Sequence, residues 1–238
     1  MKKLPVLLVA VSLLLAAAHH VVAAPVANSN LGREYLIGSD SLENWSAGLF
    51  TRLGERVISQ RGAEVDLEFS KGMAYVGYDV LRWITPYVAV GIGDVEVADV
   101  DSDGSESELA FGVHFNILDQ EIMDPTLMED RLRINANIYL GVTESTVDGS
   151  TREWEELAVN LTVSLVNDLQ GNKAYLPFSI AIYAGPAYSD YRSDDFDIEE
   201  TFGFVGGLEI FHTKRISSDL SMEKFQSEAF TASVNIRF

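Results

Sequence analysis

The last residues of the chain alternate strictly between apolar and polar side chains. The apolar positions are Phe230, Ala232, Val234, Ile236 and Phe238, and the polar positions between them are Thr231, Ser233, Asn235 and Arg237. Successive side chains of a β-strand point to opposite faces, so this period of two predicts a strand with one apolar and one polar face. The sequence stops at Phe238, and we expect no later element to cover the apolar face.

The same alternation recurs along the chain and is clearest in the segments that begin at Leu109, Leu132 and Leu157. Turn residues separate ten such segments, and we predict strands near 44–53, 64–80, 85–97, 107–117, 131–144, 154–166, 176–189, 201–212, 218–225 and 229–238. The second segment changes phase between Phe69 and Ala74, which predicts a bulge near Lys71 and Gly72.

The second face of these strands decides between two all-β architectures, a soluble sandwich and a membrane barrel. It is rich in Asn, Gly, Ser, Thr and Ala, which suits a crowded barrel interior better than a wet sandwich face. We therefore predict an all-β fold, an antiparallel up-and-down transmembrane β-barrel of about ten strands. Eight or twelve strands and the soluble sandwich remain the alternatives.

The strand that ends in Phe238 resembles the C-terminal strand of bacterial outer-membrane β-barrels. The resemblance implies a location in the outer membrane of a Gram-negative type cell envelope. It also implies that Phe238 is part of the insertion signal read by the barrel-assembly machinery. The expected partners are then outer-membrane lipid and lipopolysaccharide, while the oligomeric state is left open.

The first residues have the order of a secretory signal peptide. Lys2 and Lys3 precede an apolar stretch from Leu4 to Ala18, and small residues follow near Ala23. We predict a signal peptide at 1–23, a periplasmic lead-in at 24–43 and the barrel at 44–238. A small plug formed by 24–43 is the less favoured alternative.

Composition excludes several classes of function. The chain has no Cys, which excludes disulfides and thiol chemistry. It has 36 acidic and 17 basic residues, and removal of 1–23 would take away two of the basic ones, for a net charge near −21. Such a charge disfavours nucleic acid as a partner.

If both ends lie in the periplasm, the connections alternate between short turns and outer loops. The predicted turns are 81–85, 167–175 and 213–217, and the predicted outer loops are 54–63, 98–106, 145–153, 190–200 and 226–228. The connection from Leu118 to Asp130 is long. Because Asp124 and Pro125 form a typical helix start, we predict a short periplasmic helix near 124–130.

The aromatic residues predicted at the interfaces are Trp45, Trp83, Tyr87 and Phe238 on one side and Trp154, Tyr188 and Phe202 on the other.

Charged residues of both signs fall on the predicted inner face. They are Arg52, Asp79, Arg131, Arg133, Glu156, Glu209, Glu223 and Arg237. A ten-stranded barrel is narrow, so buried charges should find partners. We predict an ion-pair network that narrows or seals the lumen and has a structural rather than a catalytic role.

One acidic segment has the spacing of half a calcium loop. Its candidate ligands are Asp99, Asp101, Asp103, Glu106 and Glu108, with Gly104 at the turn. The position where an EF-hand needs a bidentate acid is Ala110. Calcium at this segment is therefore the one cofactor hypothesis, and a solvated acidic loop is the favoured alternative.

The predicted function is that of a non-enzymatic outer-membrane barrel with acidic outer loops and a structural or surface-interaction role. A narrow channel for small solutes is the first alternative, and an outer-rim protease or lipid-modifying enzyme is the second. Past the predicted signal peptide the histidines are His114 and His212, both placed away from the outer rim. This placement gives a hydrolase little support.

Overall fold

The structure is a computed structural model, and it describes residues 45–60, 63–81, 83–97, 102–103, 106–122, 130–147, 150–168, 179–193, 196–198, 200–213 and 215–238. These residues form an all-β fold without a helix. Across the same ranges there is accordingly no helix long and apolar enough to cross a membrane.

Ten long strands build the sheet, as predicted from the alternation. They are β1 (Trp45–Gln60), β2 (Ala63–Tyr78), β3 (Ile84–Val97), β5 (Glu106–Ile122), β6 (Asp130–Val147), β7 (Ser150–Asp168), β8 (Ser179–Ser193), β10 (Phe202–Phe211), β11 (Ile216–Lys224) and β12 (Glu228–Arg237). Two short strands, β4 (Ser102–Asp103) and β9 (Phe196–Ile198), pair beyond the main ring.

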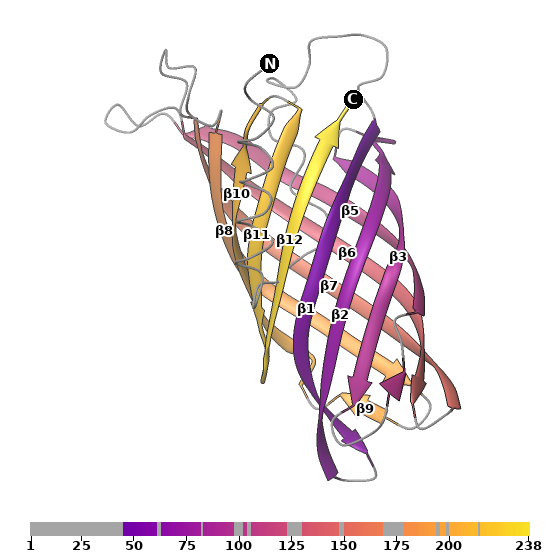
Figure 1. Ribbon diagram of the computed structural model, residues 1–238. Coiled ribbons are helices and arrows are strands. Elements are labelled where there is room, and N and C mark those ends of the chain that lie inside the picture. The colour runs from indigo at the N-terminus through magenta and orange to yellow at the C-terminus, as the bar shows by residue number, and fades with distance from the viewer. Residues whose placement is uncertain are drawn as a thin grey trace, which may run out of the picture.

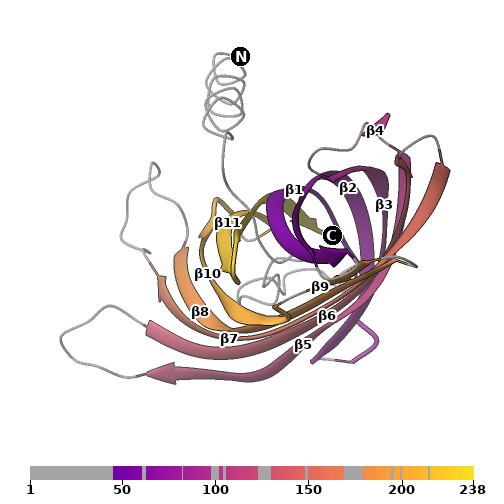
Figure 2. The same ribbon diagram turned by 90° about the horizontal axis from the view of Figure 1, so that it is seen from below.

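The ten long strands close into an antiparallel barrel (Figures 1 and 2). Each pairs with its neighbours in sequence, and β12 pairs with β1 to close the ring. At the seam Ser46 lies opposite Arg237, and the Phe238 amide donates to the Trp45 carbonyl at 3.0 Å. We call this end of the barrel the terminal end and the opposite one, with the β1–β2 hairpin and β9, the distal end. Closure leaves the main ring without an open edge.

The outer face of the ring is apolar. Each of the ten long strands exposes at least one large apolar side chain, with Phe204 at 71% and Ile182 at 66%. Val234 and Ile236 of β12 and the following Phe238 are exposed on the outer face, while Asn235 and Arg237 are buried inside, which confirms the predicted phase of the last strand. Soluble monomers rarely expose so continuous an apolar surface, whereas lipid-facing barrels require one.

Tyrosines and glycines face one another inside the ring. The directly opposed pairs are Gly48 with Tyr75, Gly112 with Tyr87 and Gly207 with Tyr183. A Cβ atom on Gly48 or Gly207 would come within 2.5 Å of the facing tyrosine side chain, and one on Gly112 would overlap the Tyr87 ring. Glycine at these positions therefore lets each tyrosine ring lie against the barrel wall.

The strands run further toward the distal end than predicted, so the loop prediction for 54–63 is wrong. β1 continues to Gln60, and its ladder with β2 runs unbroken to the pair of Gln60 with Ala63. The predictions for 145–153 and 190–200 fail in the same way, since β6, β7 and β8 extend into them. The physical reason is that backbone pairing continues past the apolar belt on the distal side, where outward residues such as Glu55, Asp66 and Glu68 are charged and the strands no longer have an apolar outer face.

The predicted bulge at Lys71 and Gly72 is also wrong. The pairing of β2 with β1 and β3 has no register shift there, and Leu67, Phe69 and Lys71 all point inward. The apparent phase change has another cause: the inward residues of β2 are apolar near its distal end, and toward the terminal end its outward residues, such as Val76 and Tyr78, are apolar instead. A register shift occurs instead in β5, between Asn116 and Leu118.

Short β9 bridges two strands that are not neighbours in the main ring. It pairs with β8 through Arg192 and Ser193, and with β1 through Ile58 and Ser59. β10, β11 and β12 lie between β8 and β1 in the ring. The wall is therefore continued at the distal end by β9 rather than by those three strands.

Two interface predictions are corrected by burial. Tyr87 and Trp154 point inward and are only 3% and 2% exposed, so neither belongs to an outer aromatic girdle. Trp45, Trp83 and Phe238 are exposed near the terminal end. The predicted signal peptide, the lead-in at 24–43 and most of the predicted helix near 124–130 lie outside the described residues, while Asp130 begins β6.

Candidate functional site in the barrel lumen

A cluster of five charged side chains crosses the lumen. Arg52 of β1 is ion paired with Glu156 of β7 and, at 2.9 Å, with Glu223 of β11. Lys71 of β2 contacts Glu108 of β5 at 2.8 Å and Glu156 at 3.0 Å. These five residues, the central charge cluster, link five strands spread around the ring, and Glu156 joins the two cations.

The cluster is buried and nearly neutral. Its side chains are between 0% and 5% exposed. Tyr139 donates a hydrogen bond to Glu108 at 2.6 Å. Arg56 adds a third cation: its guanidinium stacks over Phe225 at 3.4 Å, donates to the Ser189 carbonyl at 3.3 Å and interacts electrostatically with Glu223. Three cations thus balance three carboxylates, as buried charges require.

Apolar side chains fill the lumen on the distal side of this cluster. We call them the distal apolar plug, and they are Ile58, Leu67, Phe69, Val95, Val97, Trp154, Tyr191 and Ala229. The Phe69 and Tyr191 rings stack with centroids 5.5 Å apart, and Arg52 lies 5.2 Å from the centre of the Phe69 ring. The plug and the central charge cluster therefore form one continuous packed layer.

Further ion pairs lie toward the terminal end. Arg237 is paired with Asp79, which also accepts a hydrogen bond from Thr85 at 2.5 Å. Asp119 is paired at 3.0 Å with both Arg131 and Arg133. The first pair links β12 to Asp79, which directly follows β2, and the other two link β5 to β6.

Two buried carboxylates face each other on neighbouring strands. Glu209 of β10 lies directly opposite Asp219 of β11. Tyr183 donates to both Asp219 oxygens, at 3.0 and 2.9 Å, and Ser221 donates to one of them at 3.1 Å. Like charges placed directly opposite on a sheet repel, so this pair is a locally unfavourable feature of the lumen.

The structure places all eight sequence-predicted lumen charges inside the barrel. It brings Arg52 together with Glu156 and Glu223, and Arg237 together with Asp79, whereas Glu209 lies opposite another acid. The buried charged residues, or partners of them, that were not predicted to face inward are Arg56, Lys71, Glu108, Asp119, Asp190 and Asp219. Extending the alternation of β2 through Lys71 would have placed that residue inside.

The residues of the calcium hypothesis do not gather in the described part of the chain. Glu108 points into the lumen and belongs to the central charge cluster. Asp103 lies in β4 and Glu106 begins β5, while Asp99 and Asp101 fall outside the described residues. Within the ranges given above, no group of three His, Cys, Asp or Glu side chains could hold a metal ion.

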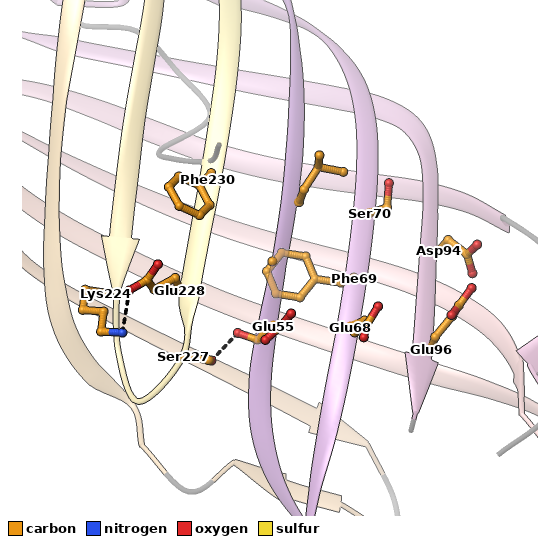
Figure 3. A pocket seen from close by; sticks show the side chains of 12 residues that line it. Glu55, Glu68, Phe69, Ser70, Asp94, Glu96, Lys224, Ser227, Glu228 and Phe230 are labelled. Atoms are coloured by element: carbon orange, nitrogen blue, oxygen red, sulfur yellow. Dashed lines mark hydrogen bonds and ion pairs between the residues drawn. The ribbon is translucent and has the colours of Figure 1, made fainter. Parts of the chain in front are cut away.

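An acidic cavity of about 870 Å³ opens beside the β11–β12 hairpin (Figure 3). Glu55, Glu68 and Glu96 are successive partners across β1, β2 and β3. Lys224 and Glu228 form an exposed pair at 2.8 Å on the hairpin. These outward charges lie on the distal side of Leu53 and Phe230, whose apolar side chains also line the cavity. They therefore mark the distal end of the apolar belt.

The two histidines differ in their surroundings. His114 is buried in the lumen between Thr85 of β3 and Asn137 of β6. His212 is exposed at the terminal end, and its Nε2 lies 2.8 Å from the Ser218 hydroxyl. Alternation within single strands could not predict the contact of His212 with Ser218, because the two residues lie on either side of a turn.

No protein-family model matches the chain, and no curated protein matches it in sequence. Among solved structures it is similar to Neisserial surface protein A (9% identity, TM-score 0.40, covering 84% of this chain and 100% of that one). It is also similar to the translocator domain of the autotransporter NalP from Neisseria meningitidis (9%, 0.37, 85% and 91%). A third similar structure is an outer membrane channel from Pseudomonas putida F1 (8%, 0.43, 91% and 100%).

All three TM-scores lie below 0.5, so these proteins assign no activity to this chain. The fold rests on the chain's own geometry, namely the closed ring of ten strands and its apolar exterior. On that ground, the chain has the fold of the outer-membrane β-barrels.

Proposed function

We propose that this chain is an integral outer-membrane barrel with a sealed lumen and a structural or surface-interaction role. One observation carries the proposal: the central charge cluster and the distal apolar plug pack against each other across the lumen. Their side chains are almost inaccessible to water. For an ion or solute to pass, the two cations of the central charge cluster would have to separate from its three carboxylates. Breaking buried ion pairs costs free energy.

The length of the apolar belt supports a membrane location. Nine residues of β1, from Ser46 to Gly54, lie between the exposed Trp45 at the terminal end and the first outward acid, Glu55. A tilted transmembrane strand needs about 9–11 residues. Glu55 and its acidic neighbours would then lie at the level of the lipid headgroups.

The proposed orientation puts the terminal end in the periplasm and the distal end outside the cell. The expected partners are outer-membrane lipid and lipopolysaccharide, with the barrel-assembly machinery reading Phe238 during insertion. The distal extensions of β1, β2, β6, β7 and β8 would present surface to the medium. No cofactor is part of the proposal.

Membrane location and sealing need separate experiments. Fractionated outer membranes should contain the protein, and the purified barrel should migrate differently on a gel before and after boiling. Reconstituted in a planar bilayer, it should give no steady conductance. A soluble periplasmic protein with no heat shift would refute the barrel location. Stable single-channel steps would refute sealing and favour the narrow channel.

The proposal includes no enzymatic activity. His212 and Ser218 are the nearest approach to a nucleophile and base, but a working pair also needs an orienting group and oxyanion donors. Their position at the terminal end differs from the outer rim expected for a surface enzyme. If lipid hydrolysis by the purified barrel were found and then lost in Ser218→Ala, this part of the proposal would be wrong.

A further inference from the structure

Four inward polar side chains form a block on two neighbouring strands of the lumen. On β5 they are His114 and Asn116, and on β6 they are Asn137 and Asn135. His114 lies directly opposite Asn137, and Asn116 lies directly opposite Asn135. We call these four residues the His–Asn patch.

The patch contains buried polar atoms that lack protein partners. Among the described residues, no hydrogen-bond partner contacts either ring nitrogen of His114 or either amide atom of Asn135. The same is true of the Asn116 oxygen and the Asn137 nitrogen. His114, Asn135 and Asn137 are only 1–2% exposed. Native proteins rarely leave such groups unsatisfied, so six of them in one block call for a ligand.

The geometry of Asn135 strengthens this argument. Rotating a side-chain amide by 180° exchanges its oxygen and nitrogen and often finds a missing partner. At Asn135 both positions lack one, so the exchange changes nothing. Asn137 is held on one side, because its oxygen accepts from the Tyr87 hydroxyl at 3.3 Å.

The surroundings of the patch favour an uncharged ligand. The two arginines that act on His114 already have acidic partners: Arg133 interacts with Asp119 and Glu209, and Arg237 is paired with Asp79. A free anion in the patch would be repelled by those acids, and a free cation would be repelled by the arginines. The patch itself offers amide donors and acceptors side by side, which is what a small hydroxylic molecule requires.

We propose that the His–Asn patch is a buried binding site for small uncharged hydrogen-bonding molecules, with ordered water as the resident ligand. A water molecule makes two to four hydrogen bonds, so a few of them satisfy the six atoms. The site is enclosed within the barrel and does not depend on how the outer surface is used.

The test is nuclear magnetic resonance of the full chain folded in detergent micelles, with asparagine side chains labelled. Magnetisation transfer from water should reach the side-chain amide protons of Asn135 and Asn137. Asn235 is the matched control: it is equally buried, but it donates to Ser233 at 3.1 Å and accepts from Tyr75 at 2.6 Å. We expect transfer to Asn135 at least threefold stronger than to Asn235. Equal transfer, or none at Asn135, would overturn the proposal.

The substitution Asn135→Leu gives an independent test, because a dry site and a hydrated site predict opposite changes in stability. In a dry site, Asn135→Leu would remove two unsatisfied atoms and raise the urea midpoint of unfolding. In a hydrated site, it expels bound water, so we expect a lower midpoint and a loss of transfer to Asn137. A raised midpoint would contradict bound water. If the variant does not fold, the comparison of Asn135 with Asn235 in the unchanged chain decides alone.

Discussion

Glu156 joins the two cations of the central charge cluster, so its neutralisation tests how the lumen is held together. The substitution Glu156→Gln keeps the size of the side chain and removes one negative charge. Arg52 and Lys71 would then share a neutral amide, whose oxygen can accept from one of them while its nitrogen faces the other. Because both cations are buried, neither can turn to water.

The expected cost follows from burial. Breaking a buried ion pair by removing one partner costs about 3–5 kcal/mol, because a charge is left uncompensated. Glu156 is 1% exposed and has two cationic partners, so we expect a value within this range. That value changes the unfolding equilibrium constant more than a hundredfold.

The measurement is urea unfolding of the refolded barrel in lipid vesicles, followed by tryptophan fluorescence. Trp154 packs in the distal apolar plug and reports on this region directly. The matched control is Glu228→Gln, which removes the same charge from the exposed pair with Lys224, whose side chains are about half exposed. Exposed pairs contribute less than about 1 kcal/mol, so the control should change stability little.

Equal effects of the two substitutions would refute the reasoning, since they would mean that Glu156 is solvated like Glu228. The double variant Glu156→Gln with Lys71→Met provides a second check. Lys71 also pairs with Glu108, so its loss has a cost of its own, but the double variant restores the balance of charge. The loss of stability should therefore be smaller than the sum of the two single losses, as expected for residues of one network. A strictly additive loss would mean that Lys71 and Glu156 do not interact.

Three further predictions concern the wall, the lipid face and the acid pair. Gly112→Ala should lower stability by about 1–3 kcal/mol, seen as a lower urea midpoint, because the added methyl overlaps the Tyr87 ring. Val163→Arg, on the outward face of β7, should cost about 2–4 kcal/mol in vesicles. A change within 0.5 kcal/mol, typical of a wet surface, would argue against lipid there. Glu209→Gln should raise the stability by up to about 1 kcal/mol, seen as a higher urea midpoint, by relieving repulsion with Asp219; a lower midpoint would mean that the attraction between Glu209 and Arg133 outweighs this repulsion.

The strands could be predicted from the sequence because each carries its own periodic signal. β12 is the clearest case: its phase followed directly from Val234, Asn235, Ile236 and Arg237. The prediction from alternation fails where the inner and outer faces of one strand each change between apolar and polar along its length. Leu67 of β2 is apolar and points inward, because the distal lumen is filled with apolar side chains. A single strand cannot reveal that its interior has two zones.

The identity of the charged partners could not be predicted, for a geometric reason. Which side chains meet across a lumen depends on strand tilt and register around the whole ring. Arg52 and Glu156 lie 104 residues apart, and no local pattern links them. The sequence could place Arg52, Glu156 and Glu223 on the inner face. It could not show that their side chains meet at the same height in the lumen, because this depends on how the barrel closes.

The lumen also explains why an acidic chain tolerates so many buried charges. Acids on the outer face near Glu55 repel one another in contact with solvent, where water and salt screen them. Inside, the carboxylates of the central charge cluster are matched by Arg52, Arg56 and Lys71, so the scarce basic residues are placed where screening is absent. The directly opposed acids Glu209 and Asp219 depart from this arrangement. The uneven placement of cations follows from the cost of burial: an unpaired acid is tolerated outside the barrel and is destabilising within it.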